Sequence, residues 1–257
     1  MHRAIGFKAF AFILLICGIS SVLMAQESGA DLKKEIEELK QGQQAIQKEL
    51  MQIKSMLTKI AKPPSLPQIN IKDVEFELGD NPVQGRDTAK FILIEFTDYQ
   101  CPHCSRYVRD TYSQIEEQYV DKGVMRYAVI EQPLPIHPLA RKAAEASHCA
   151  DDQGKFWEMH KLMMFKQDTL PNLSSLALSL SLDAEKFEQC LNTEKYQDQV
   201  EKNSELALKL GINGVPGFII ASVDPQDPGK AKGISAVLGA MPYSIFKKEL
   251  DRALNGQ

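Results

Sequence analysis

The chain has 257 residues, of which 44% are hydrophobic and 25% are charged. This length allows one sizeable domain with extensions, or two small domains, and the balance of side chains is that of a globular protein with a real core. The formal net charge is −4 and no stretch is rich in Lys and Arg, so nothing in the sequence favours binding to nucleic acid.

Residues 1–25 have the layout of a secretory signal. Arg3 and Lys8 are followed by an uncharged, mostly apolar run that ends at Ala25, before polar sequence. Leu23 stands where a small residue is favoured for cleavage. This leaves an uncleaved inner-membrane anchor as the alternative, although the run is at the short limit for a membrane span. We expect export to the periplasm or another extracytoplasmic space, with cleavage favoured over anchoring.

Residues 31–62 form a separate module in which Leu or Ile, with one Gln, recurs at alternate spacings of four and three. These positions form a stripe along one side of a helix, here called the seam. A seam this narrow over about four heptads is typical of a coiled coil, and an amphipathic helix lying on the protein's own surface is the alternative. The choice of Leu and Ile favours a trimer or tetramer over a dimer, so we expect a homo-oligomer formed through residues 31–62. The seam consists of Leu32, Ile36, Leu39, Gln43, Ile46, Leu50, Ile53, Leu57 and Ile60.

Residues 63–72 separate this module from the rest of the chain. Pro63, Pro64 and Pro67 end the helix and predict a stiff, extended linker. Over residues 73–257 the pattern becomes that of one folded domain, in which apolar strands and amphipathic helices follow one another.

The folded domain is predicted to be α/β, with a largely helical block over about residues 138–210 inserted into the plan of a central sheet. Residues 217–223 and 234–238 are typical of an antiparallel hairpin around a polar turn at 224–232, and a last helix begins near Pro242. The elements expected before the helical block are strands at 74–78, 91–96 and 124–130 and a helix at 102–119.

The sequence Cys101-Pro102-His103-Cys104 follows the predicted strand 91–96 and opens the next helix. Free N–H groups and the dipole at a helix start stabilise a thiolate at Cys101. Pro102 suits the first helical position, His103 can add a positive charge or a hydrogen-bond donor, and Cys104 lies one turn on, near enough for a disulfide with Cys101. These placements predict a redox-active pair, with an inert local disulfide or half of a zinc site as the alternatives.

Cys149 and Cys190 lie in the helical block. An even number of cysteines suggests pairing in an oxidising compartment, and the short Cys101–Cys104 gap favours that local pair, which leaves Cys149 with Cys190. We therefore expect a structural disulfide, with two buried free thiols as the alternative. Zinc would need a second CxxC ligand pair, to which neither Cys149 nor Cys190 belongs, so we expect no metal and no cofactor.

Two runs of residues resemble the DsbA family of bacterial periplasmic thiol oxidoreductases, within the thioredoxin superfamily. They are residues 95–104 (EFTDYQCPHC) and 214–218 (GVPGF), and the stretch 143–157 between them is similar to the family's helical insertion. The resemblance covers roughly residues 70–255 and implies a thioredoxin fold with an inserted helical domain. The coiled coil lies outside the usual DsbA pattern and is similar to the association helix of oligomeric relatives.

The resemblance also implies roles for single residues. Cys101 would be the nucleophile that forms a mixed disulfide with a client protein, and Cys104 the buried resolving thiol. Pro216 would be a cis-proline that faces the dithiol and leaves the backbone around Val215 open to pair with a bound chain. The residues alone are equally compatible with an ordinary trans turn. Glu95 would be a buried acid that exchanges protons with Cys104.

Other polar side chains have less specific interpretations. For Glu95 the alternative is a strand-edge glutamate that faces water, and Asp98 is a nearby competitor for its proton-transfer role. The histidines are expected to pack in the core or lie on the surface, and the methionines to fill a helix core, with an adaptable client-binding surface as the alternative. These residues are His137, His148 and His160, and Met159, Met163 and Met164 with Trp157.

Three functions compete at this stage. The first is a dithiol oxidase of exported proteins, and the second is an oligomeric isomerase or reductase that is kept reduced. The third is a holdase scaffold with a vestigial CxxC. The expected partners are reduced or misfolded exported proteins and a membrane redox partner that is DsbB-like, VKOR-like or DsbD-like.

Overall fold

The computed structural model describes residues 33–56, 69–224 and 226–256. The predicted signal (1–25) and residues 63–68 of the predicted linker lie outside the described residues, as do three residues of the predicted seam, Leu32, Leu57 and Ile60. Within the described ranges, none of the helices has the length and apolar character that a membrane crossing requires. The chain divides into two compact units, residues 1–64 and 65–257.

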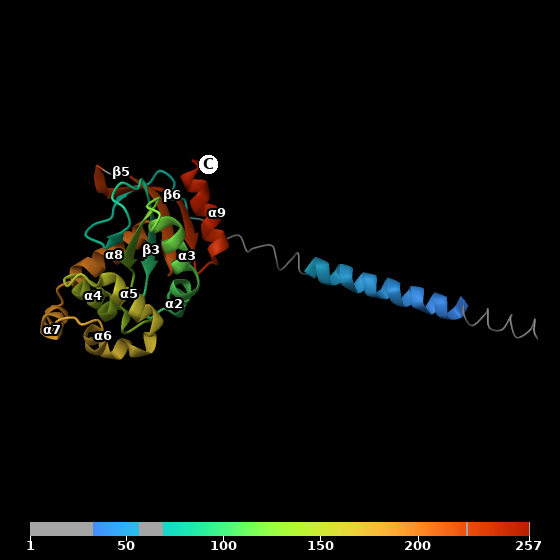
Figure 1. Cartoon of the computed structure of the whole chain (residues 1–257), viewed down its shortest axis with the longest axis horizontal. Coiled ribbons are helices and arrows are strands. Elements are labelled where there is room, and N and C mark those ends of the chain that lie inside the picture. The colour runs from blue at the N-terminus through green and yellow to red at the C-terminus, as the bar shows by residue number, and fades with distance from the viewer. Residues whose placement is uncertain (1–32, 57–68, 225, 257) are drawn as a thin grey trace, which may run out of the picture. The chain divides into compact units, whose positions relative to one another are not determined.

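The described part of the first unit is one uninterrupted helix over residues 33–56 (Figure 1). Every residue of this helix is exposed, including the apolar ones at the predicted seam positions. The prediction of a helix is confirmed for these residues, and the prediction of association stays a prediction. The exposed seam residues are Ile36, Leu39, Ile46, Leu50 and Ile53, with exposed fractions between 43% and 73%.

The described part of the second unit contains one sheet of six strands in the order β1-β6-β5-β3-β4-β2. Strands β3 and β4 are parallel, and the other neighbouring pairs are antiparallel. The strands are β1 (Glu75–Glu77), β2 (Val83–Gln84), β3 (Phe91–Thr97), β4 (Arg126–Glu131), β5 (Gly217–Asp224) and β6 (Asp227–Leu238).

Strand β3 lies in the middle of the sheet and is covered on both faces. Ile92, Ile94 and Phe96 belong to one buried cluster, whereas Leu93 belongs to the other, which also contains Cys104. Because successive strand residues point to opposite faces, Glu95 and Thr97 share the face of Leu93. The sequence therefore places two polar side chains on the face of β3 that looks toward the dithiol.

Helical segments surround this sheet and include the predicted helical insertion. In Figure 1, α4, α5, α6 and α7 gather in one block, and α3 and α9, which contact each other, lie together away from it. The helical segment after the CPHC sequence runs as α2 (Pro102–Tyr107), η1 (Val108–Tyr112), α3 (Ser113–Ile115) and η2 (Glu116–Val120). The insertion contains α4 (Ala140–Asp151), α5 (Phe156–Phe165), η3 (Gln167–Asn172), α6 (Leu173–Ser179), α7 (Ala184–Asn192) and α8 (Gln197–Lys209), and the last helix is α9 (Tyr243–Leu254).

The structure corrects the predicted end of the sheet. The polar turn expected at residues 224–232 is wrong, because β6 begins at Asp227 and pairs with β5 along most of its length. Lys230 and Lys232 also pair with β1 at the edge of the sheet, opposite Glu77 and Glu75. Polar side chains are compatible with a strand at such an edge, where they reach water.

The helical insertion is closed by a disulfide between Cys149 on α4 and Cys190 on α7. The two Cα atoms are 5.8 Å apart, and the bond links residues that are 41 positions apart in sequence. The predicted pairing is confirmed, and the alternative of two free thiols is wrong.

Candidate active site

The CPHC sequence lies where the central strand passes into a helix. Strand β3 ends at Thr97, and Cys101 is the N-cap of α2, with Pro102 in the first turn. Both Cys101 and Cys104 are free thiols, with exposed fractions of 4% and 0%. The sequence thus predicted the location of this pair correctly, at the start of a helix.

The helix start has a direct electrostatic effect on Cys101. A hydrogen bond from the Cys104 thiol and the backbone N–H groups of Cys104 and His103 lower the pKa of Cys101 to about 6, against the effects of burial and of the Asp98 carboxylate. The amide of His103 makes this contribution, and its side chain is exposed. A thiol with such a pKa is largely ionised in neutral water, so Cys101 can act as a nucleophile or a leaving group.

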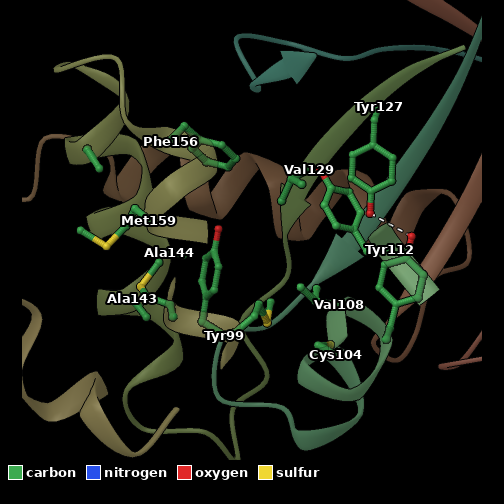
Figure 2. Packing of buried hydrophobic residues seen from close by; sticks show 14 of the residues in the cluster. Tyr99, Cys104, Val108, Tyr112, Tyr127, Val129, Ala143, Ala144, Phe156 and Met159 are labelled. Atoms are coloured by element: carbon green, nitrogen blue, oxygen red, sulfur yellow. Dashed lines mark hydrogen bonds between the residues drawn. The ribbon is translucent and has the colours of Figure 1, made fainter. Parts of the chain in front are cut away.

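Cys104 has the opposite character. Burial raises its pKa well above the ordinary value, and the neighbouring Cys101 raises it further. Figure 2 shows Cys104 among packed side chains of the buried cluster, near Val108. A buried thiol of this kind stays protonated unless another group accepts its proton.

The Val215–Pro216 segment comes from a distant part of the sequence to the same place. The peptide bond between these residues is cis, as the resemblance implied, and the carbonyl oxygen of Val215 lies 3.8 Å from Cys101 Sγ. The first residue of β5, Gly217, follows directly. The structure therefore places backbone polar groups beside the more accessible of the two thiols.

Glu95 is completely buried on β3. Burial raises the pKa of its carboxyl group to about 7, although the hydrogen bond from Tyr127 and the nearby Thr97 hydroxyl act in the opposite direction. The Tyr127 hydroxyl donates to Glu95 Oε2 and lies 3.1 Å from the Tyr107 hydroxyl. The alternative of a strand-edge glutamate facing water is wrong.

Asp98 has its carboxylate occupied by backbone and side-chain donors. Its Oδ1 accepts a hydrogen bond from the backbone N–H of Gln100 at 2.7 Å. Its Oδ2 accepts one from the N–H of Leu134 at 2.8 Å and lies 2.7 Å from His137 Nδ1. These contacts fix the turn that leads from β3 to Cys101, and they make Asp98 a less suitable proton carrier than Glu95.

Sequence reasoning missed two residues that support the site. Gln167 donates from Nε2 to the carbonyl oxygens of Tyr99 and Cys101, at 2.8 and 2.9 Å. No local pattern marks Gln167, which lies 66 positions after Cys101. Tyr127 could have been suspected, because a tyrosine in a strand covered on both faces needs a partner for its hydroxyl.

The remaining sequence candidates take part in packing. His148 Nε2 lies 3.0 Å from Glu131 Oε2, and His160 Nδ1 lies 3.2 Å from the Tyr99 hydroxyl. In the described ranges, no group of three His, Cys, Asp or Glu side chains is arranged to hold a metal ion. The predicted helix core is confirmed, because Met159, Met163 and Met164 are each fully buried and Trp157 packs against the cluster to which they belong.

Comparisons with known proteins give consistent results for the second unit. The family model described as Thioredoxin matches residues 77–240. Disulfide bond formation protein D of Bacillus subtilis is 32% identical over 150 residues, which are 54% of this chain and 67% of that protein. The crystal structure of Wolbachia pipientis α-DsbA1 is 26% identical, with a TM-score of 0.61, and the match covers 70% of this chain and 93% of that one.

Another relative is much longer than the matched region. The Na⁺/H⁺ antiporter NhaA 3 of Salinispora tropica is 30% identical over 171 residues, which are 65% of this chain. The chain spans about a quarter of the length of that protein, since 26% of it is covered.

Proposed function

This chain belongs to the thioredoxin superfamily, in its DsbA-like group, and from that premise we propose that it is a thiol–disulfide oxidoreductase for exported proteins. The observation that carries the proposal is the asymmetry of its two thiols. The pKa of Cys101 is lowered to about 6 and that of Cys104 is raised, so one sulfur is a good leaving group and the other is held protonated.

The chemistry proceeds by two thiol–disulfide exchanges. A client thiolate attacks Cys101 Sγ of the Cys101–Cys104 disulfide, so that a client–Cys101 mixed disulfide forms and Cys104 leaves as a thiolate that takes up a proton. A second client thiolate then attacks the client sulfur of the mixed disulfide, and Cys101 leaves as a thiolate. Two electrons pass from the client to the enzyme, and the client gains one disulfide.

The low pKa of Cys101 favours the oxidase direction. Stabilising the thiolate stabilises the reduced enzyme, and a stable reduced form makes the disulfide a stronger oxidant. We expect a reduction potential well above the roughly −270 mV of thioredoxin, toward the DsbA value of about −120 mV. Equilibration with glutathione buffers measures this quantity, and oxidation of a reduced, unfolded client protein measures the activity. A potential near −270 mV, together with a dithiol found mostly reduced in cells, would contradict the oxidase.

The exposed apolar seam of residues 33–56 favours a second candidate, an oligomeric isomerase. Several active sites around one shared space could bind a misfolded client together. A reoxidising partner would have less access to the active sites of such an assembly. The most exposed seam residues are Leu39, Ile46 and Leu50, and an exposed apolar stripe of this kind is normally covered by another helix. In this view the chain forms a trimer or tetramer through residues 31–62.

Substitutions on one helix separate association from helix formation. Ile46→Lys with Leu50→Lys should give a monomer in analytical ultracentrifugation, because two charges in the seam cannot be buried. Gln47→Lys is the matched control, since it adds a charge to the exposed helix outside the seam. A wild-type protein that sediments as a monomer would exclude the oligomer. Isomerase activity that is unchanged in the seam variant would exclude its dependence on assembly.

The partners and location follow from the same function. Reduced or misfolded exported proteins are the clients, and a membrane redox partner that is DsbB-like, VKOR-like or DsbD-like resets the dithiol. This cycle requires an extracytoplasmic location, which the predicted signal over residues 1–25 would supply. Trapping partners on Cys104→Ser, which cannot resolve the mixed disulfide at Cys101, identifies both clients and redox partner on non-reducing gels.

A further inference from the structure

Two polar atoms beside the buried thiol have no hydrogen-bond partner among the described residues. They are Glu95 Oε1 and Thr97 Oγ1, and both side chains have an exposed fraction of 0%. Buried polar atoms in native proteins are nearly always paired, and an exception calls for an explanation such as a catalytic role. The two residues that carry these atoms lie two positions apart in sequence, on the same face of β3.

Thr97 acts on both the carboxyl group and the thiol. Burial raises the pKa of both groups, and the Thr97 hydroxyl interacts with each of them and acts in the opposite direction. These contacts are too open to count as formed hydrogen bonds in this reduced state, since Thr97 Oγ1 has no such bond to any described residue. Cys104 belongs to the same buried cluster as Tyr127, the partner of Glu95, and both are labelled in Figure 2.

The rest of the Glu95 carboxyl group is held in place. Tyr127 donates to Oε2, and the Tyr127 hydroxyl lies 3.1 Å from that of Tyr107, so Oε1 is the carboxyl oxygen left without a partner among the described residues. A hydroxyl group can donate one hydrogen bond while it accepts another. Thr97 therefore has the chemistry to pass a proton in either direction without changing its own protonation state.

We propose that Thr97 is a catalytic residue that relays a proton between Glu95 and Cys104, while Tyr127 holds the other oxygen of Glu95. This inference rests on the proposed function, because it assigns the proton that the exchange reaction needs. When a client thiolate breaks the Cys101–Cys104 bond, Thr97 donates its hydroxyl proton to the Cys104 thiolate and takes the proton of Glu95. The products are a neutral Cys104 thiol, a neutral Thr97 and an ionised Glu95.

The reverse transfer prepares the resolving step. With Cys101 in a mixed disulfide, Cys104 passes its proton through Thr97 to the ionised Glu95. The Cys104 thiolate then attacks Cys101 Sγ, the Cys101–Cys104 bond forms and the bound thiolate leaves. Each sulfur–sulfur bond that breaks is replaced by one that forms, and the proton stays on this chain.

Other titratable groups around Glu95 do not supply this path. Tyr127 and Tyr107 face it from β4 and α2, and burial keeps both hydroxyls protonated by raising their pKa values well above normal. Tyr99 and Tyr112 are nearby and have raised pKa values for the same reason. Burial works against the ionised form of Glu131, but His148 outweighs it and lowers the pKa of Glu131, so this group stays an anion.

The experiment measures the lifetime of the mixed disulfide between Cys101 and glutathione. Reduced full-length protein is mixed with oxidised glutathione, samples are quenched in acid, and mass spectrometry follows the mixed disulfide between pH 5 and 9. Thr97→Val should prolong its lifetime at least tenfold near pH 7, since general acid–base catalysis typically contributes about 10²–10⁴-fold. It should also remove the part of the pH dependence of the resolving rate that the ionisation of Glu95 produces. Thr97→Ser should restore the rate to within about threefold, since it keeps the hydroxyl.

The controls separate a relay from a structural effect. Thr111→Val removes another buried threonine hydroxyl, one that donates to the Met241 carbonyl at 3.2 Å, and should leave the lifetime unchanged. The first step, attack by Cys101, should keep its rate in every variant. A Thr97→Val protein that resolves the mixed disulfide at the wild-type rate and with the wild-type pH profile overturns the relay.

Two further measurements keep the proposal testable. If Thr97→Val does not fold, the wild-type resolving step should still slow at least twofold in D₂O, and the absence of any isotope effect overturns the relay. Oxidation of a client by the wild-type protein is measured separately. Failure there contradicts the proposed function and leaves the glutathione result to decide the relay.

Discussion

The two cysteine pairs of the second unit are similarly buried and yet have different chemistry. Cys101 and Cys104 have exposed fractions of 4% and 0%, and those of Cys149 and Cys190 are 1% and 8%. Cys101 is the N-cap of α2, where amide groups point at its sulfur, whereas Cys149 and Cys190 lie inside α4 and α7. Position relative to a helix start, rather than burial, separates a reactive pair from a structural one.

Removing the reactive sulfur is the strongest test of this comparison. Cys101→Ser should lower the rate of client oxidation by at least about a thousandfold, because a serine hydroxyl does not carry out disulfide exchange. Stopped-flow fluorescence of an unfolded client measures the rate, and circular dichroism checks the fold. Residual activity within tenfold of the wild-type protein would show that the chemistry lies elsewhere, in the Cys149–Cys190 pair or outside both pairs.

Removing the other pair should affect stability instead. Cys149→Ala with Cys190→Ala opens a loop of 41 positions, and loop-closure entropy predicts a loss of about 4 kcal/mol in the free energy of unfolding. Urea denaturation measures this loss. The rate of client oxidation per folded molecule should stay within twofold of the wild-type rate. A fall in activity as large as that of Cys101→Ser would end the distinction between the two pairs.

The pH dependence of stability tests the environment of the reactive pair. The pKa of Glu95 is about 7 in the folded protein and 4.5 when unperturbed, so the unfolded chain loses this proton first as the pH rises. The contribution of Glu95 to the free energy of unfolding is complete below about pH 4.5 and is lost as the pH rises to about 7. This change amounts to about 3 kcal/mol. Glu95→Gln should remove this slope and be more stable than the wild-type protein at pH 8.

The Glu95 measurement needs the disulfide form, in which Cys101 and Cys104 do not titrate. Urea denaturation at several pH values between 4 and 8 gives the slope. Glu201→Gln is a suitable control, because Glu201 forms an exposed ion pair with Arg141. It should leave the slope as it is. A wild-type slope that persists in Glu95→Gln would mean that another buried group with a raised pKa, such as His148, titrates in this range.

The sequence predicted the parts of the site that depend on local order. The apolar run of β3, followed by Cys101 and Pro102, marks a buried strand that passes into a helix, and this junction was predicted correctly. The turn predicted at residues 224–232 was wrong because β1, a strand of three residues at the sheet edge, pairs with a polar segment. Pairing across such a distance leaves no local pattern.

The same limit explains which site residues were missed. Glu95 was found because it lies six positions before Cys101 in a recognisable run. The contact of Tyr127 with Glu95 crosses from β4 to β3, and Gln167 reaches the turn from η3 in the helical insertion. Thr97 lies within the recognised run, but only its unpaired burial draws attention to it. The sequence could therefore indicate that a buried hydroxyl such as that of Tyr127 needs a partner, but not which side chain the fold brings to it.

Gln167 gives the smallest predicted effect and joins the two regions compared above. It lies in the helical insertion that the Cys149–Cys190 bond closes, and it donates to the carbonyl oxygens of Tyr99 and Cys101. Gln167→Leu keeps the approximate volume and leaves both carbonyl groups without this donor, which should lower the free energy of unfolding by about 1–2 kcal/mol. Urea denaturation of the reduced protein measures this change.

The Gln167 variant also tests how the turn before Cys101 is held. The amide groups that lower the pKa of Cys101 belong to α2 itself, so alkylation of Cys101 by iodoacetamide should keep its apparent pKa near 6. Gln153→Leu is the control from the same insertion, because the Gln153 side chain exchanges its hydrogen bonds with the exposed backbone of Asp183. A clear rise in the apparent pKa of Cys101 for Gln167→Leu alone would show that the insertion also lowers this pKa, in addition to supporting the turn. The reactive pair would then depend on the region that the structural pair holds closed.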